Sequence, residues 1–368
     1  MILPSKREGS VHLGLFMECD YRAGSSVEDA LIEAFELVKT CEDGGMDGVW
    51  LAERHFASPE QLRRAGSGAV PSIASAPLLL ASAIAARTSR LRIGIAVSVL
   101  PLAHPVRLAE EIATLDHISG GRFELGVGRS GFATSYAGYG IPYDESRERF
   151  QECLDILLLA WSQETFSYSG KHYAFEDVCV VPKPRQQPHP PIRIAATTSE
   201  TFPMVGRLGY PIFIGLRGSD LEMNASNLAA YHQAWRDAGH AGRGDVYLRI
   251  PVYVAATAEA AYEEPRDSTT ANYRSRGEGY ASRSQGAGSV EERAEFARRI
   301  AASGYDDLLR TRLAYGTPDA VARRLAELRD ELGLSGFLLE ANVGGAIPPD
   351  RVMNSLRLFA QQVAPALH

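Results

Sequence analysis

The chain has 368 residues, of which 45% are hydrophobic and 23% charged, and its formal net charge is −7. This composition is typical of a globular protein, and the negative charge disfavours nucleic acid or an anionic membrane as a partner. The four cysteines lack CxxC spacing, which indicates reduced thiols, and no apolar run has the length of a membrane span or signal peptide, so a cytoplasmic protein is expected. The sparse histidines predict no metal site.

Apolar runs of strand length alternate with amphipathic stretches of helix length along almost the whole chain. Strands are predicted at residues 11–18, 48–52, 91–100, 122–127, 192–196, 211–216, 247–255 and 336–340. Helices are predicted at residues 27–42, 76–86, 106–118, 145–161 and 350–363, the first capped by Ser26 and the third begun by Pro105. Several strands are apolar on both faces, as parallel strands covered by helices must be. Eight such strands, each followed by a helix, predict a single (β/α)8 TIM barrel over residues 1–368, with a doubly wound open sheet as the alternative.

Two segments interrupt this alternation. Residues 166–191 combine aromatic side chains with a proline cluster and are predicted to form an inserted hairpin that caps the barrel. Residues 272–289 are rich in Gly, Ser and Arg and lack periodicity. That second segment is either a disordered surface loop or a mobile lid, because long structureless loops inside compact domains are often functional.

The ends of the predicted strands carry the candidate chemistry, as expected for a barrel. Glu53 and His55 follow the second strand, and His55 is the acid/base candidate of useful pKa. The run RFELGVGRSGF, from Arg122 to Phe132, is a strand that opens into a glycine-rich turn carrying the cation Arg129. The hydroxyl cluster at 197–201 precedes a helix, where it either binds a phosphate or merely caps the helix. No GxSxG elbow occurs, so hydrolase chemistry has little support.

Several motifs, in this order and spacing, resemble the bacterial-luciferase-like flavin-dependent monooxygenases. The matching segments are 48–56 (GVWLAERHF), 92–107 (RIGIAVSVLPLAHPVR), 119–129 (SGGRFELGVGR), 316–319 (GTPD) and 340–342 (EAN). The resemblance implies a (β/α)8 barrel that binds reduced FMN (FMNH2) delivered by a separate flavin reductase. It also implies that O2 is used to oxygenate a small organic substrate, and that the protein is a homodimer.

The resemblance assigns roles to particular residues. Glu53, Ala96 and Val97 are expected to line the flavin, and Phe132 is expected to lie beside its ring system. The positions that match the flavin phosphate site are Arg129, Arg147, Thr198 and Thr201. The segment 272–289 falls where luciferase has its mobile loop.

One departure from luciferase bears on catalysis. Luciferase has two adjacent histidines after this glutamate, and the first is its catalytic base. Here that position is Arg54, whose guanidinium cannot act as a base at neutral pH. His55 is therefore the remaining catalytic candidate, with a purely structural role as the alternative, and light-emitting aldehyde oxidation is disfavoured. Two other functions stay open: hydride transfer with a deazaflavin on the same barrel, and a non-catalytic flavin-binding partner subunit.

Overall fold

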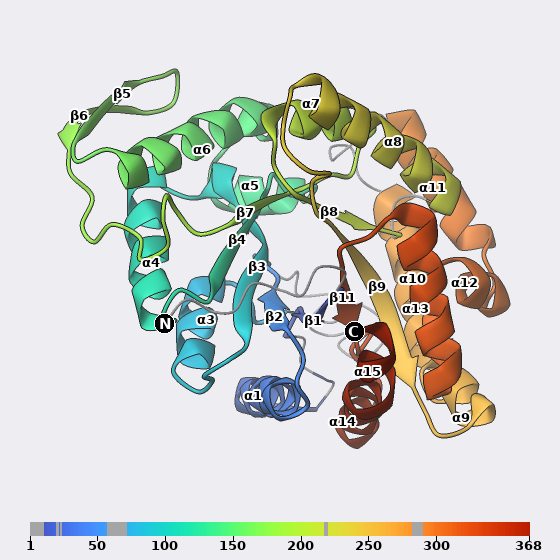
Figure 1. Ribbon diagram of the computed structural model, residues 1–368. Coiled ribbons are helices and arrows are strands. Elements are labelled where there is room, and N and C mark those ends of the chain that lie inside the picture. Colours follow the sequence, from blue (N-terminus) through green and yellow to red (C-terminus); the bar gives the residue numbers. More distant parts are fainter. Residues whose placement is uncertain (1–10, 20–21, 23, 57–71, 217–219, 282–289) are drawn as a thin grey trace.

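Eight parallel strands close into a barrel in the computed structural model, which describes residues 11–19, 22, 24–56, 72–216, 220–281 and 290–368 (Figure 1). In ring order they are β1 (His12–Met17), β2 (Gly48–Leu51), β3 (Arg92–Val99), β4 (Phe123–Gly128), β7 (Ile192–Ala195), β8 (Ile212–Gly215), β9 (Val246–Val254) and β11 (Gly336–Glu340). Parallel pairing of β11 with β1 and of β8 with β9 closes the ring. The predicted (β/α)8 barrel is thereby confirmed, and the open sheet is excluded.

Helices surround the barrel on its outer face (Figure 1). The longer ones are α1 (Val27–Asp43), α3 (Pro77–Ala85), α4 (Pro105–Ile118), α6 (Ser146–Ser162), α7 (Thr201–Leu208), α8 (Leu221–Asp237), α10 (Arg266–Ala281), α11 (Val290–Ala302), α13 (Pro318–Leu332) and α14 (Pro349–Leu358). Short elements connect them: η1 (Leu100–Leu102), α5 (Ala133–Gly138), η2 (Tyr143–Glu145), α9 (Ala258–Glu263), α12 (Tyr305–Thr311), β10 (Ala314–Gly316), the π-helical η3 (Phe359–Val363) and α15 (Ala364–Leu367). None of the helices in the described ranges is long and apolar enough to cross a lipid bilayer.

Local sequence determines where α1 begins. Ser26 Oγ accepts a hydrogen bond from the Asp29 N–H at 3.0 Å, and the Asp29 carboxylate accepts one from the Ser26 N–H at 2.8 Å. This capping box satisfies two backbone donors that the first turn leaves without helical partners. The predicted N-cap at Ser26 is therefore confirmed.

Aromatic side chains fill the interior of the barrel. Trp50 is fully buried and packs against Phe213 and Tyr247, and its indole N–H donates to His12 Nε2 at 3.0 Å. A Cβ on Gly94 would lie 2.1 Å from the Trp50 ring, so the neighbouring strand needs a glycine there. Because these rings occupy the interior, a ligand must enter at the mouth formed by the C-terminal ends of the strands.

The predicted inserted hairpin is present but lies at the flank of the barrel. β5 (Phe166–Ser169) pairs antiparallel with β6 (Ala174–Val178), and the hairpin extends outward beside α4 and α6 (Figure 1). The Tyr173 hydroxyl donates to the Ala103 carbonyl at 3.3 Å, which ties the hairpin to the segment before α4. The hairpin is thus attached to the outer helices, a different place from the expected cap.

The Gly- and Ser-rich segment 272–289 is partly helical. Its first ten residues, 272–281, are the last ten of the 16 residues of α10, and residues 282–289 lie outside the described residues. Tyr273 is 4% exposed and packs with Ile300 and Leu308 in a small apolar cluster. We attribute the helix to this packing, since the glycines in the segment each disfavour helix by about 1 kcal/mol.

Candidate active site

Four charged side chains form a row of ion pairs across the barrel mouth, in the order Arg54, Glu18, Arg249 and Glu340. Arg54 Nη2 donates to Glu18 Oε1 at 2.8 Å, and Arg249 Nη2 donates to the same oxygen at 2.7 Å. Arg249 Nε also donates to Glu340 Oε1 at 2.7 Å, while its guanidinium lies 3.6 Å from the centroid of the Phe16 ring. None of the four charged side chains is more than 25% exposed. Two cations and two anions compensate one another, which allows them to be held in a partly buried site.

Sequence reasoning missed Arg249, although the sequence contains a signal for it. Arg249 is a single charge within the otherwise apolar run VYLRIPVYV of β9. A charge in a strand that is buried on both faces must find a partner, because an unpaired buried charge is strongly destabilising. This pattern could have identified Arg249 as an interior ion-pair residue.

Glu53 and His55 contact each other directly at the end of β2. Their side chains are 12% and 9% exposed, and Glu53 Oε1 lies 2.8 Å from His55 Nε2. The other carboxylate oxygen, Oε2, accepts from Ser98 Oγ and from the Val99 N–H, both at 3.1 Å. The second imidazole nitrogen, Nδ1, lies 3.1 Å from the hydroxyl of Tyr139, which follows α5. Glu53 therefore joins β2 to β3, and His55 joins β2 to the segment after β4.

Ala96 and Val97 lie on β3 where its register with β4 shifts between Ile95 and Ser98. Their peptide bond is cis, and both side chains pack, partly exposed, against the aromatic interior of the barrel. A Cβ on Gly128 of β4 would lie 2.6 Å from Val97 Cγ2. The two predicted flavin-lining residues thus occupy a closely packed surface between β3 and β4.

Phe132 lies beside Arg54, the first residue in the row of ion pairs at the barrel mouth. The Arg54 guanidinium carbon is 4.6 Å from the centroid of the Phe132 ring, within reach of a cation–π interaction. The Phe132 N–H donates to Ser130 Oγ at 3.2 Å, and Ser130 itself has a φ of 58°. The glycine-rich turn after β4 therefore brings an aromatic ring next to the residues that follow β2.

The predicted phosphate-binding residues come from three segments that contact one another. Arg129 Nη1 donates to Ser146 Oγ at 3.3 Å, which joins the end of β4 to the start of α6. Arg147 Nη2 lies 3.5 Å from Glu200 Oε2, which joins α6 to the turn before α7. Thr198 Oγ1 in that turn and Thr201 Oγ1 at the first residue of α7 are 2.9 Å apart.

A cavity of about 430 Å³ lies at the first two of these segments, the end of β4 and the start of α6. It is lined by Arg129, Tyr143, Asp144, Glu145, Ser146, Arg147, Glu148 and Lys171. Lys171 is paired with Glu148 at 2.7 Å, whereas the Arg129 guanidinium contacts a hydroxyl group. Guanidinium and hydroxyl donors suit a phosphate monoester, which accepts charge-assisted hydrogen bonds, but the lining also holds three carboxylates, those of Asp144, Glu145 and Glu148.

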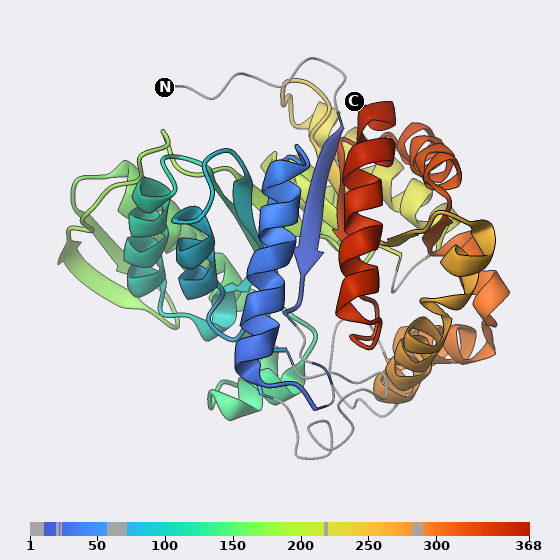
Figure 2. The ribbon, with the colours of Figure 1, turned by 90° about the horizontal axis from the view of Figure 1, so that it is seen from below.

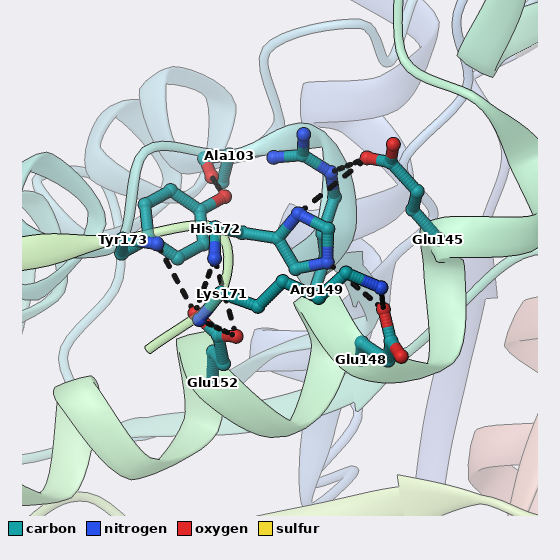
Figure 3. A network of polar contacts seen from close by, with 8 residues as sticks. All are labelled: Ala103, Glu145, Glu148, Arg149, Glu152, Lys171, His172 and Tyr173. Atoms are coloured by element: carbon teal, nitrogen blue, oxygen red, sulfur yellow. Dashed lines mark hydrogen bonds and ion pairs between the residues drawn. The ribbon is translucent and has the colours of Figure 1, made fainter. Parts of the chain in front are cut away.

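The hairpin contributes Lys171 to this cavity because a carboxylate holds its turn (Figure 3). Glu152 of α6 accepts hydrogen bonds from the backbone N–H groups of Lys171, His172 and Tyr173 at 2.8 to 3.3 Å. The hydrogen bond and ion pair with Lys171, together with a contact to His172, lower the pKa of the Glu148 carboxyl. Sequence reasoning missed Ser146 and Lys171, whose place in the cavity depends on these tertiary contacts.

The sequence of the chain matches a model of the family described as luciferase-like monooxygenases over residues 11–336. It is 28% identical to limonene 1,2-monooxygenase of Rhodococcus erythropolis over 369 aligned positions, 97% of this chain and 87% of that protein. The chain spans about half the length of other curated relatives that it matches, two uncharacterised proteins of Sinorhizobium fredii.

Solved structures share the fold at low sequence identity. The oxygenating constituent of 3,6-diketocamphane monooxygenase from Pseudomonas putida, in complex with FMN, aligns with a TM-score of 0.78 at 20% identity, over 97% of this chain and 98% of that one. An F420-dependent secondary alcohol dehydrogenase aligns with a TM-score of 0.70 at 15% identity, over 98% and 99% of the two chains. These likenesses agree with the (β/α)8 barrel described above.

Proposed function

Because this chain belongs to the luciferase-like monooxygenase family, we propose that it is the oxygenase of a two-component system that uses FMNH2 and O2 to oxygenate a small organic substrate. The observation that carries the proposal is the cavity lined by Arg129, Ser146 and Arg147, with Arg147 also contacting Glu200, which lies between Thr198 and Thr201 in the sequence. FMN carries one phosphate, and the Arg129 and Arg147 guanidinium groups and the Ser146 hydroxyl are donors that such a group accepts. A separate flavin reductase and a second copy of the chain are the proposed partners, in the cytoplasm.

Different residues of the proposed site would contact the flavin phosphate, the flavin ring system and the substrate. Arg129, Arg147, Thr198 and Thr201 would hold the phosphate, and Ala96, Val97 and Phe132 would contact the ring system. When bound, the reduced flavin would supply the electrons that activate O2. The row of ion pairs formed by Arg54, Glu18, Arg249 and Glu340 would line the substrate side of the mouth with oriented polar groups.

Glu53 and His55 would carry the proton chemistry of the proposed site. Glu53 is held by Ser98 and the Val99 N–H, so its second oxygen can orient the His55 imidazole. A positioned acid/base group of this kind contributes about 10²-fold or more to a rate. In this proposal His55→Asn therefore retains flavin binding and melting temperature, and loses product formation by about that factor.

Hydride transfer with a deazaflavin is the second candidate, supported by the shared fold of the F420-dependent dehydrogenase. Anaerobic titration with FMNH2, oxidised FMN and reduced F420 separates the two functions. Tightest binding of FMNH2, followed by O2-dependent product formation with a generic flavin reductase, supports the monooxygenase. Tighter binding of reduced F420 with O2-independent turnover would replace it, and flavin binding without turnover would indicate a non-catalytic partner subunit.

A further inference from the structure

Both nitrogens of the His55 imidazole are engaged, which constrains what His55 can do. Nε2 faces Glu53 at 2.8 Å and Nδ1 faces the Tyr139 hydroxyl at 3.1 Å. With Glu53 ionised and the ring neutral, Nε2 carries the imidazole proton, because a carboxylate can only accept, and Nδ1 is then an acceptor. The Tyr139 hydroxyl must in turn donate to Nδ1. The three groups therefore form a chain with one consistent direction of hydrogen bonding.

This direction is that of a carboxylate–imidazole–hydroxyl triad, in which the carboxylate orients the imidazole and the imidazole takes the hydroxyl proton. We propose that Tyr139 is the terminal acid/base group of a Glu53–His55–Tyr139 triad at the barrel mouth. The proposal rests on the oxygenase function proposed above and adds the group that exchanges a proton with the reacting molecule. The His55 side chain is 9% exposed, whereas the Tyr139 residue is 46% exposed, so Tyr139 is the more accessible of these two members of the triad.

The packing around Tyr139 holds its ring in place for this role. The Tyr139 and His55 rings meet edge to face with centroids 5.0 Å apart, and the Phe56 ring lies 5.3 Å from Tyr139. A Cβ on Gly138 would lie 2.2 Å from the Phe56 ring, so a glycine is needed before Tyr139. Tyr139 directly follows α5, which lies at the end of the barrel toward which the arrow of β1 points (Figure 2). Strand arrows point to the C-terminal ends of the strands, so this end is the barrel mouth.

The proton balance of the step is simple. A substrate proton moves to the Tyr139 oxygen while the Tyr139 proton moves to His55 Nδ1, and the substrate keeps the electron pair. The resulting imidazolium carries the charge beside the Glu53 carboxylate, and the reverse step returns the proton. Burial and the nearby Glu53 raise the pKa of the Tyr139 hydroxyl, so a free phenolate is disfavoured and the transfer to His55 must accompany the reaction.

Imidazole nitrogen NMR tests the geometry without any turnover. In protein with ¹⁵N-labelled histidine, assigned through His55→Asn, the expected state has a protonated Nε2 and a hydrogen-bonded, unprotonated Nδ1. Tyr139→Phe should shift the Nδ1 resonance and leave that of Nε2 in place. Tyr262→Phe is the matched control, because it removes a surface hydroxyl that bonds Asp306 at 2.9 Å. A proton on Nδ1, or no shift in Tyr139→Phe, would overturn the triad.

A double-mutant cycle tests the chemistry. Residues that act as a unit lose activity together, so Tyr139→Phe, His55→Asn and the double variant should each slow product formation by about 10²-fold. Losses that multiply would show independent roles and overturn the proposal, as would a Tyr139→Phe variant as active as Tyr262→Phe. Wild-type protein that has the NMR signature but oxygenates nothing would count against the oxygenase function and leave the hydrogen-bonded triad standing.

Discussion

The two arginines of the proposed phosphate site should differ in their contribution to flavin binding. Arg129 is half-buried and lines the cavity, whereas the Arg147 side chain is 74% exposed. A hydrogen bond to a charged group is worth about 1.5–3 kcal/mol when shielded from water, or roughly tenfold to 150-fold in affinity. Exposed ion pairs are worth about 0.2–1 kcal/mol. Arg129→Ala should therefore weaken FMNH2 binding by roughly tenfold or more, and Arg147→Ala by no more than about fivefold.

Anaerobic titration with FMNH2 measures both losses, and riboflavin, which lacks the phosphate, provides the comparison ligand. Riboflavin affinity should stay nearly unchanged in both variants. Arg107→Ala is a matched control, since Arg107 is 78% exposed and pairs with Glu111 on the outer surface of α4. Equal losses for FMNH2 and riboflavin, or a larger loss for Arg147→Ala than for Arg129→Ala, would refute the assignment of the cavity to the phosphate.

Three further predictions concern single carboxylates. Glu200→Gln should tighten FMNH2 binding by about two- to fivefold, because it frees a phosphate-site arginine from a competing exposed ion pair; an unchanged titration would contradict this. Glu152→Ala should cost about 1–3 kcal/mol in urea unfolding and speed hydrogen exchange at amides 171–173, which lose their buried acceptor, and protection equal to wild type would argue otherwise. Burial raises the pKa of Glu42, but hydrogen bonds from the 89–91 segment outweigh it and lower the pKa in the folded state. The stability from Glu42 is then present above its unfolded pKa and lost as pH falls through the folded value, so Glu42→Gln should flatten the acid side of the stability curve, and an unaltered slope would speak against it.

Much of the fold could be predicted from the sequence because its signals are local. The alternation of apolar runs and amphipathic stretches predicts eight strand–helix units, and the first helix was predicted at residues 27–42 where α1 spans Val27–Asp43. Composition gave a wrong prediction for residues 272–281, where tertiary packing outweighs local preference. Residues 272–281 look like a loop because of their Gly and Ser content, yet they are helical in α10, where Tyr273 is buried in an apolar cluster.

The candidate site was predictable in part for the same reason. Glu53, His55, Arg129 and Thr198 stand directly after predicted strands, and in a parallel barrel those positions all meet at one mouth. The sequence alone therefore predicted that these four residues lie at the same end of the barrel, but it did not identify Arg249 there. It also determined that position 54 holds an arginine that cannot serve as a base.

Only the tertiary structure decided how these residues pair. Arg249 reaches Glu18 and Glu340 because β11 lies between β9 and β1 in the closed ring. The Tyr139 hydroxyl bonds His55 across 84 positions of the chain. Side-chain hydrogen bonds act over about 3 Å, so their partners are selected by the closure and stagger of the barrel, to which no local pattern of residues corresponds.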